Sequence, residues 1–257
     1  MSTVFYLPVG SEVEVFKQAH AQKLSLLLKG PTGCGKTRFV EFMADQLGLE
    51  LITVSCNEDT SATDLLGRFL IKGGETVWVD GPVVRALRNG AILYLDEIAE
   101  ARPDALVVIH SLTDYRREIY LDRTAEKLHA PPSFMLIASY NPGYQRSMRE
   151  LKQSTRQRFV GLSFAYPSAK LEAEIVVKES GVDLKSAQKL VALGAKMRTL
   201  HDLSLLETVS TRLLVSAGKL MAAGVAPRLA CKVAVVEPLT DDLDALMAMN
   251  AVVELSM

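Results

Sequence analysis

The segment GPTGCGKT at residues 30–37 constrains the fold of this chain more than any other stretch of its sequence. Four of its residues match the phosphate-loop pattern G-x-x-x-x-G-K-[ST]: Gly30, Gly35, Lys36 and Thr37. An apolar run at 24–28 precedes the segment, and a helical pattern at 36–47 follows it. A strand, a glycine-rich turn and a helix in this order direct backbone N–H groups toward a phosphate. The segment therefore predicts an α/β fold that binds a nucleotide.

The rest of the N-terminal part supports this fold. Five short runs are apolar without alternation, at 24–28, 51–55, 91–95, 134–139 and 160–164. Helical patterns separate them, at 36–47, 103–113 and 147–157. Unbroken apolar strands alternating with helices are typical of a parallel sheet covered on both faces. We therefore expect a doubly wound α/β domain with five parallel strands.

Beyond residue 166 the strand patterns end. Only helical patterns follow, at 168–179, 184–199, 209–222, 227–236 and 241–253. Proline and glycine residues separate these patterns, as expected for helix boundaries. The sequence thus predicts two domains, an α/β domain over 1–166 and an all-helical domain over 167–257.

Composition argues against several classes of protein. The 29 Lys and Arg residues nearly balance the 30 Asp and Glu residues, and the two signs are interspersed, so we expect neither a nucleic-acid partner nor an anionic membrane. No apolar stretch reaches the roughly 18 residues of a membrane span. The N-terminus has no secretory signal pattern, and the three cysteines form no disulfide framework. These features predict a cytoplasmic, soluble protein.

The loop also suggests particular ligands. Lys36 is placed to neutralise the β and γ phosphates of ATP, and the Thr37 hydroxyl to bind Mg²⁺. An ordinary glycine-rich turn is the alternative. The candidate nucleotide-binding residues are Gly30, Pro31, Thr32, Gly33, Cys34, Gly35, Lys36, Thr37 and Arg38.

A pair of carboxylates follows the third apolar run. In AILYLDEI, residues 91–98, the strand ends at Asp96 and Glu97. Ligands bind at the carboxyl edge of open α/β sheets, where Asp96 can hold magnesium and Glu97 can polarise the attacking water. A solvated turn is the alternative for the pair by itself, but a preceding phosphate loop favours the catalytic interpretation.

A third polar group follows the run at 134–139. In FMLIASYNP, residues 134–142, Asn141 comes directly before a proline. An amide at this strand end can orient water or contact the γ phosphate. The alternative is a simple Asn-Pro turn.

Together these motifs resemble an AAA+ ATPase over essentially the whole chain. The phosphate loop, the Asp-Glu strand, the strand-terminal Asn, STRQRF at 154–159 and VSTRLL at 209–214 carry the resemblance. Residues 63–98 resemble most specifically the MoxR branch and its CbbQ and NorQ group. The resemblance implies ATP hydrolysis with Mg²⁺. It makes Lys36 and Thr37 part of Walker A, Asp96 and Glu97 Walker B, and Asn141 sensor 1.

The resemblance also implies two phosphate-binding arginines. The arginine finger, which reaches a neighbouring subunit's γ phosphate, corresponds to Arg158 or Arg156. Arg156 and Arg158 are two positions apart, so on a helix they would point to different faces. Arg158 is the first choice, because it matches the family's Arg-Phe pair before the last strand. Arg212 corresponds to sensor 2 in the helical lid, and a guanidinium can bind phosphate oxygens in pairs. Each could instead be an ordinary surface arginine.

Two insertions also resemble features of the MoxR branch. Residues 68–80 predict a hairpin around two glycines, and residues 116–133 predict a second one. In a ring the first would project toward the pore, with Phe69, Leu70, Lys72 and Trp78 as candidate client contacts. For Trp78, packing under the hairpin is an equal alternative.

The resemblance finally implies partners. It suggests a homo-oligomer, expected to be a hexameric ring, acting with an adaptor protein that carries a von Willebrand A domain. The better-known relatives remodel Rubisco to release inhibitory sugar phosphates, so Rubisco is the first candidate client. Maturation of nitric oxide reductase, as for NorQ, and a nucleotide-gated assembly module of the gas-vesicle type are the alternatives.

Overall fold

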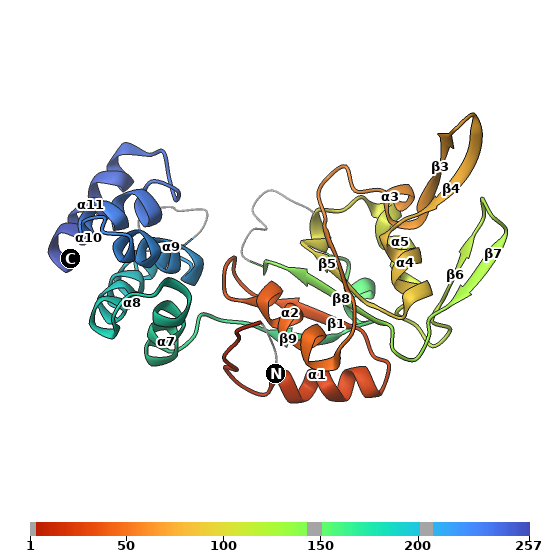
Figure 1. The fold of residues 1–257 in the computed structure, drawn as a ribbon, viewed down its shortest axis with the longest axis horizontal. Coiled ribbons are helices and arrows are strands. Elements are labelled where there is room, and N and C mark those ends of the chain that lie inside the picture. The colour runs from red at the N-terminus through yellow and green to blue at the C-terminus, as the bar shows by residue number, and fades with distance from the viewer. Residues whose placement is uncertain (1–3, 143–150, 201–207) are drawn as a thin grey trace. The chain divides into compact units, whose positions relative to one another are not determined.

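A computed structural model describes residues 4–142, 151–200 and 208–257 of the chain (Figure 1). Its contacts divide the chain into two compact units. Unit 1 comprises Met1–Gly30 and Gly35–Ser163, and unit 2 comprises Pro31–Cys34 and Phe164–Met257. Each unit is described separately.

Unit 1 is built of a parallel sheet, helices and two hairpins. Its helical elements are α1 (Glu12–Ala21), α2 (Lys36–Leu47), α3 (Ala62–Leu66), α4 (Pro82–Asn89), the 3₁₀ turn η1 (Ile98–Glu100), α5 (Pro103–His110) and α6 (Gln153–Arg156). The sheet strands are β1 (Leu26–Lys29), β2 (Leu51–Ser55), β5 (Ile92–Asp96), β8 (Met135–Tyr140) and β9 (Val160–Ser163). The hairpin strands are β3 (Gly67–Lys72), β4 (Glu75–Asp80), β6 (Glu118–Leu121) and β7 (Glu126–His129).

The five-stranded sheet has the order β2-β5-β8-β1-β9, and all of its neighbouring strands are parallel. All six residues of β8 are buried, as are the first four residues of β5. The edge strand β9 instead alternates between half-buried and exposed residues. Because the inner strands are covered on both faces, their sequences are continuously apolar. The predicted five-stranded parallel sheet is therefore confirmed.

Helices cover both faces of this sheet. Leu93 and Leu95 of β5 belong to a buried cluster that also contains residues of α4 and α5. Successive side chains of a strand point to opposite faces, so Tyr94 lies on the other face. Its hydroxyl approaches Thr37, near the start of α2, at 3.5 Å. On α1 and α2, Phe16 and Phe39 stack edge to face with ring centroids 5.6 Å apart.

Both predicted hairpins are present. Strands β3 and β4 pair antiparallel around Gly73 and Gly74, whose positive φ angles of 61° and 89° suit a two-residue hairpin turn. Strands β6 and β7 form the second hairpin (Figure 1). Arg88 of α4 connects the two, because it donates to Asp80 of β4 and to both carboxylate oxygens of Glu126 on β7.

Trp78 packs within the first hairpin. Its ring lies edge-on to Phe69, with centroids 5.2 Å apart, and its indole N–H donates to Asp80 Oδ1 at 2.7 Å. Trp78 is half-buried, whereas the side chains of Phe69 and Ile71 are exposed. These contacts favour the packing alternative for Trp78 and leave Phe69 and Ile71 on the hairpin surface.

The helix predicted over 147–157 is wrong in extent. Residues 143–150 lie outside the described part, and in the remainder only α6, Gln153–Arg156, is helical. Helix α6 is therefore a single turn, and β9 begins four residues after it, at Val160. Arg158 therefore follows the helix instead of lying on it.

Unit 2 is helical throughout its regular elements. These are α7 (Ala169–Ser180), α8 (Leu184–Arg198), α9 (Thr211–Ala222), α10 (Pro227–Cys231), the π-helical turn η4 (Lys232–Val236) and α11 (Leu243–Ser256). The five α-helices and η4 all contribute residues to one buried apolar cluster, which includes Val176, Leu190, Leu214 and Met249. The five predicted helices are present, and the fourth continues from α10 into η4.

A buried ion pair joins three segments of unit 2. Arg198 at the end of α8 donates to both carboxylate oxygens of Glu172 on α7, at 2.9 and 2.6 Å. Glu172 also accepts from the Thr211 hydroxyl at 2.6 Å, and Arg198 donates to the Val209 carbonyl at 2.7 Å. The Glu172 side chain is only 1% exposed. Removing one partner would therefore leave a buried charge poorly compensated.

We expect Arg198→Met to lower the free energy of unfolding by about 3 kcal/mol, since it removes the guanidinium and keeps an apolar stem. Urea unfolding followed by far-UV circular dichroism measures this loss. Lys196→Met, the same kind of change at an exposed site of α8, should shift stability by less than about 0.5 kcal/mol. Equal stability of the Arg198 and Lys196 variants would contradict the importance of the pair.

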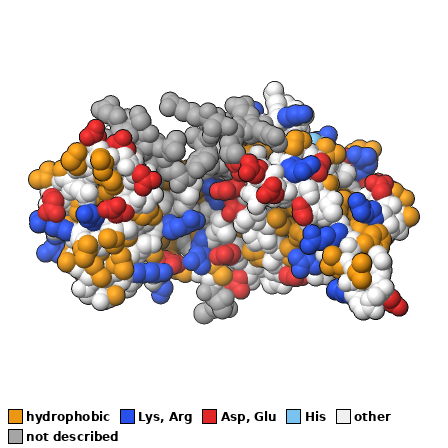
Figure 2. All heavy atoms as spheres, turned by 90° about the horizontal axis from the view of Figure 1, so that it is seen from above, with side chains coloured by type: hydrophobic (Ala, Val, Ile, Leu, Met, Phe, Trp, Pro, Cys, Tyr) orange, Lys and Arg blue, Asp and Glu red, His pale blue; other side chains and the backbone are white. Residues whose placement is uncertain are grey.

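The surface carries charges of both signs. On the face drawn in Figure 2, Lys and Arg side chains are interspersed with Asp and Glu side chains. Among the described helices, none combines the length and apolar character needed to cross a membrane.

Candidate nucleotide-binding site

The phosphate-loop segment, the Asp96–Glu97 pair and Asn141 follow strands that end at one edge of the sheet of unit 1. Strands β1, β5 and β8 are neighbours or next neighbours and run parallel, so their carboxyl ends meet at the same edge. The phosphate-loop segment follows β1, Asp96 ends β5, and Asn141 follows β8. This edge is where ligands bind in open parallel sheets.

The loop has the backbone that its glycines predict. Gly33 and Gly35 have positive φ angles of 68° and 100°, a region that side chains with a Cβ rarely adopt. Gly35 is the N-cap of α2, so the loop leads directly into a helix N-terminus. The Lys36 amine donates to the Gly30 carbonyl at 2.8 Å. The Lys36 amine is thus held next to the loop, where the phosphates of a nucleotide would lie.

Asp96 and Thr37 form an oxygen-rich pair. The Thr37 hydroxyl donates to Asp96 Oδ2 at 3.3 Å, although the two residues are 59 positions apart in sequence. One carboxylate and one hydroxyl fit Mg²⁺, which binds proteins through one or two carboxylates and completes its shell with phosphates and water. The described residues contain no cluster of three or more His, Cys, Asp and Glu side chains that could hold a metal unaided. The donor set therefore fits magnesium delivered with a nucleotide.

Glu97 has an unusual backbone conformation. Its φ of 55° lies in the left-handed region, and its N–H donates to the Ser139 hydroxyl at 3.2 Å. Non-glycine residues in this region are uncommon and concentrate at functional sites. The Glu97 side chain is exposed at the edge of the sheet, where it can meet water.

Two side chains near these carboxylates, Cys56 and Tyr94, have raised pKa values. Burial, assisted by the charges of Asp96 and Glu97, raises the pKa of the Cys56 thiol to about 12. Burial and the Asp96 charge also raise the pKa of Tyr94. Both groups stay protonated at neutral pH, so Cys56 is not a nucleophilic thiolate and Tyr94 remains a hydrogen-bond donor.

Asn141 lies beside the start of the loop. The register pairs Lys29 of β1 with Tyr140 of β8, and the Gly30 N–H donates to the Tyr140 carbonyl at 3.4 Å. The next residue, Asn141, is half-buried. The sheet thus brings Asn141, the loop, Asp96 and Glu97 to one edge.

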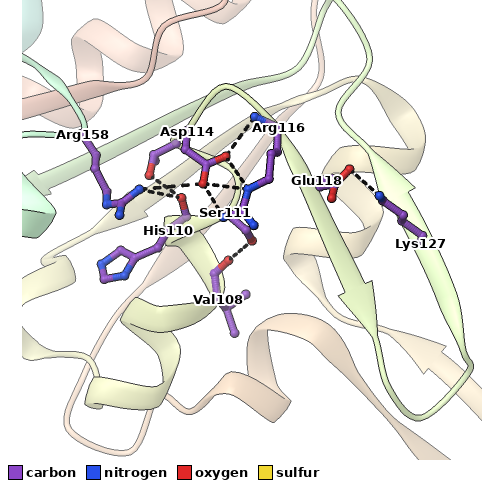
Figure 3. Close-up of polar contacts among 9 residues, drawn as sticks. Val108, His110, Ser111, Asp114, Arg116, Glu118, Lys127 and Arg158 are labelled. Carbon is purple, nitrogen blue, oxygen red and sulfur yellow. Dashed lines mark hydrogen bonds and ion pairs between the residues drawn. The ribbon is translucent and has the colours of Figure 1, made fainter.

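Arg158 lies in a different cluster, at the end of α5 (Figure 3). Its guanidinium pairs with Asp114 Oδ2 at 3.9 Å and donates to the His110 carbonyl at 3.5 Å. Arg116 approaches the same Asp114 carboxylate closely and through several atoms. Figure 3 shows Arg158 and Arg116 on opposite sides of Asp114. Arg116 contacts Asp114 more closely than Arg158 does, so the ion pair between Arg158 and Asp114 is a loose one.

The cluster has a buried support. His110 Nε2 lies 3.0 Å from the hydroxyl of Thr155, which is 2% exposed. Burial, followed by the charges of Arg158 and Lys152, lowers the pKa of His110. His110 is therefore neutral at physiological pH and adds no positive charge beside Arg158.

The remaining predicted cations are exposed. Arg156 is the last residue of α6, and Arg38 on α2 pairs with Glu41 at 3.5 Å. Arg212 is the second residue of α9 in unit 2 and follows the Ser210 N-cap and Thr211. Their predicted contacts with a nucleotide remain predictions.

The sequence interpretation missed two side chains that bind Asp96. Tyr94 Oη donates to Asp96 Oδ1 at 2.8 Å, and the Ser139 hydroxyl donates to the same oxygen. In the sequence both residues are merely members of apolar strands, AILYL and FMLIAS. Their polarity within buried strands was the available signal.

Comparison with known proteins identifies the family. Residues 25–159 match the AAA domain (dynein-related subfamily), and residues 172–256 match the CbbQ/NirQ/NorQ C-terminal domain. The chain belongs to the AAA ATPases. Within that family it is of the CbbQ/NirQ/NorQ type, as the resemblance implied. Family membership makes it an ATPase and implies nucleotide binding.

Relatives of this AAA ATPase cover nearly its whole length. It is 55% identical over 99% of its length to the denitrification regulatory protein NirQ of Pseudomonas aeruginosa, covering 98% of that protein. It is 56% identical to the protein NorQ of Paracoccus denitrificans, with 93% of this chain and 89% of that one aligned. Protein CbbQ of Hydrogenophilus thermoluteolus is 52% identical, with 97% and 94% aligned.

Solved structures agree in fold. A RuvB variant from Thermotoga maritima matches with a TM-score of 0.57 at 16% identity, covering 95% of this chain and 69% of that one. A putative ATPase from Cytophaga hutchinsonii matches with a TM-score of 0.55 at 14% identity, covering 97% and 90%. At these identities the matches establish the AAA fold alone.

Proposed function

We propose that this AAA ATPase is a motor that uses ATP hydrolysis to remodel a protein client. The observation that carries the proposal is the assembly of the loop with Lys36, the Thr37–Asp96 pair, Glu97 and Asn141 at one sheet edge. Hydrolysis of a nucleoside triphosphate needs a phosphate cradle, a magnesium site and a group that activates water, and these residues can supply all three.

Each residue then has a distinct role. Lys36 and the loop hold the β and γ phosphates, and Thr37 and Asp96 hold magnesium, which when bound spreads the charge of the phosphates. Glu97 accepts a proton from the attacking water, since its exposed carboxylate lies at the same edge. Asn141 orients that water or the γ phosphate.

Two arginines complete the site. Arg158 acts as a finger that reaches the nucleotide of a neighbouring subunit, and its loose pairing with Asp114 leaves it able to move. A finger supplied by a neighbour requires an oligomer, and a hexameric ring is the arrangement that the family resemblance implies. Arg212 acts from the helical lid on the nucleotide bound by its own subunit.

The first candidate client is Rubisco. In this role the ATPase, together with an adaptor that carries a von Willebrand A domain, releases inhibitory sugar phosphates from Rubisco. The chain is 52% identical to a protein named CbbQ, and the CbbQ group is the one whose resemblance suggests Rubisco as the client, so this identity supports the role. A second candidate, maturation of nitric oxide reductase, is supported by identities of 56% and 55% to proteins named NorQ and NirQ, the latter described as a denitrification regulatory protein.

Reconstitution decides between the clients. Sugar-phosphate-inhibited Rubisco, the adaptor and this ATPase are mixed with ATP, and carboxylation is followed over time. We expect recovery of carboxylation that Glu97→Gln abolishes. No recovery, combined with ATP-dependent activation of nitric oxide reductase, would transfer the proposal to the second client.

A nucleotide-gated assembly module would use the same fold differently. In that case ATP binding switches the conformation, and turnover is not required. Steady-state phosphate release without a client separates the two, because a motor releases phosphate continuously. Intact ATP binding without any turnover, alone or with adaptor and client, would favour the switch.

A further inference from the structure

Two buried hydroxyl groups surround Asp96 in unit 1. Tyr94 on β5 and Ser139 on β8 are both 0% exposed. The β5–β8 register pairs Leu95 with Ala138, so the following residues, Asp96 and Ser139, lie side by side. Tyr94 precedes Asp96 by two positions and therefore points to the same face of the sheet. The fold thus brings both hydroxyls to one carboxylate.

The two oxygens of Asp96 have different partners. Oδ1 accepts from Tyr94 Oη at 2.8 Å and from the Ser139 hydroxyl. Oδ2 accepts from the Thr37 hydroxyl at 3.3 Å. Two donors on Oδ1 prevent the carboxylate from rotating and leave Oδ2 on the side of the loop. A phenylalanine at position 94 would fill the same volume without this hydrogen bond.

We propose that Tyr94 and Ser139 are positioning residues that fix the Asp96 carboxylate, so that Oδ2 stays available to magnesium. This inference rests on the proposed function of Asp96 and assigns a role to two residues outside the motifs. Hydrogen bonds to a charged acceptor in a buried setting are the stronger kind. Their loss should therefore be measurable as weaker magnesium binding.

Ser139 has a second contact that Tyr94 lacks. Its oxygen accepts the Glu97 N–H at 3.2 Å, so one hydroxyl holds both the Asp96 carboxylate and the left-handed backbone of Glu97. The Tyr94 hydroxyl instead contacts the two proposed magnesium ligands, Asp96 at 2.8 Å and Thr37 at 3.5 Å. Loss of the Tyr94 hydroxyl should therefore affect magnesium, whereas loss of the Ser139 hydroxyl should also affect hydrolysis.

Tyr94→Phe tests the first half of the proposal. Thermal shift or calorimetry measures ADP binding first without magnesium and then over a magnesium titration. We expect unchanged ADP binding without magnesium and an increase of about tenfold in the magnesium concentration needed for half-maximal stabilisation. Tyr120→Phe removes the same hydroxyl from an exposed residue of β6 and should match the wild type.

Ser139→Ala tests the second half. At saturating magnesium we expect ADP to bind as in the wild type and steady-state turnover to fall by about tenfold. Wild-type magnesium dependence in Tyr94→Phe together with wild-type turnover in Ser139→Ala would overturn the inference. Should Tyr94→Phe not fold, wild-type magnesium dependence and turnover in Ser139→Ala would overturn it. A wild-type protein that binds no nucleotide would instead refute the proposed function, so the two failures are distinguishable.

Discussion

Glu97→Gln is expected to retain ATP and to lose hydrolysis by about a hundredfold or more, because an amide cannot accept a proton from water. The substitution preserves the size of the side chain, and the Glu97 N–H can still donate to Ser139. The binding proposed for Lys36, Thr37 and Asp96 would not involve this carboxylate. ATP affinity should therefore stay within a fewfold of the wild-type value.

Equilibrium binding of ATP and single-turnover hydrolysis measure the two properties of the Glu97 variant separately. Glu100→Gln is the matched control, since it makes the same change three residues later in η1. We expect wild-type turnover from this control. Rapid hydrolysis by Glu97→Gln would contradict the assignment of Glu97 as the base.

Arg158→Ala is expected to reduce turnover by about a thousandfold, the range reported for loss of an arginine supplied by a neighbour. Among the described residues, the exposed guanidinium of Arg158 contacts only Asp114, in a loose ion pair, and the His110 carbonyl, through a long hydrogen bond. Its removal should therefore cost little stability. Arg156→Ala is the matched control and should keep most of the activity.

Mixing two inactive variants tests whether Arg158 acts on a neighbouring subunit. Arg158→Ala keeps its own Glu97, and Glu97→Gln keeps its own Arg158. If the subunits form a ring, about a quarter of the sites in an equimolar random mixture would combine both intact groups. Steady-state phosphate release from the mixture should recover accordingly. A mixture as inactive as its components would argue that Arg158 acts within its own subunit or not at all.

Patterns within short segments of the sequence predicted the features that depend on those segments alone, such as the inner strands and the glycines of the loop. The inner strands are buried on both faces, so their apolar runs were visible in the sequence, and Gly35 sits where the loop requires a positive φ. Helix α4 was missed although Pro82 at its start and Gly90 after its end are standard boundary signals. The helix is strongly amphipathic, so its short length of eight residues explains that omission.

Contacts between distant segments could not be predicted. Ser139 binds Asp96 only because the β5–β8 register aligns them, and a register cannot be obtained from the composition of either strand. Arg158 and Asp114 likewise meet only through the packing of α5 against the segment after α6. Sequence patterns identified the residue types at the sheet edge, whereas the fold determined their hydrogen-bond partners.

The central claim is that the loop at the end of β1 binds ATP with magnesium. Titration of folded protein with ATP and Mg²⁺, followed by calorimetry, tests it most directly when Lys36→Ala is titrated in parallel and both proteins have the same circular dichroism spectrum. We predict saturable binding to the wild type and a large loss of affinity in the variant. Equal affinities, or no binding to well-folded wild type, would contradict the claim.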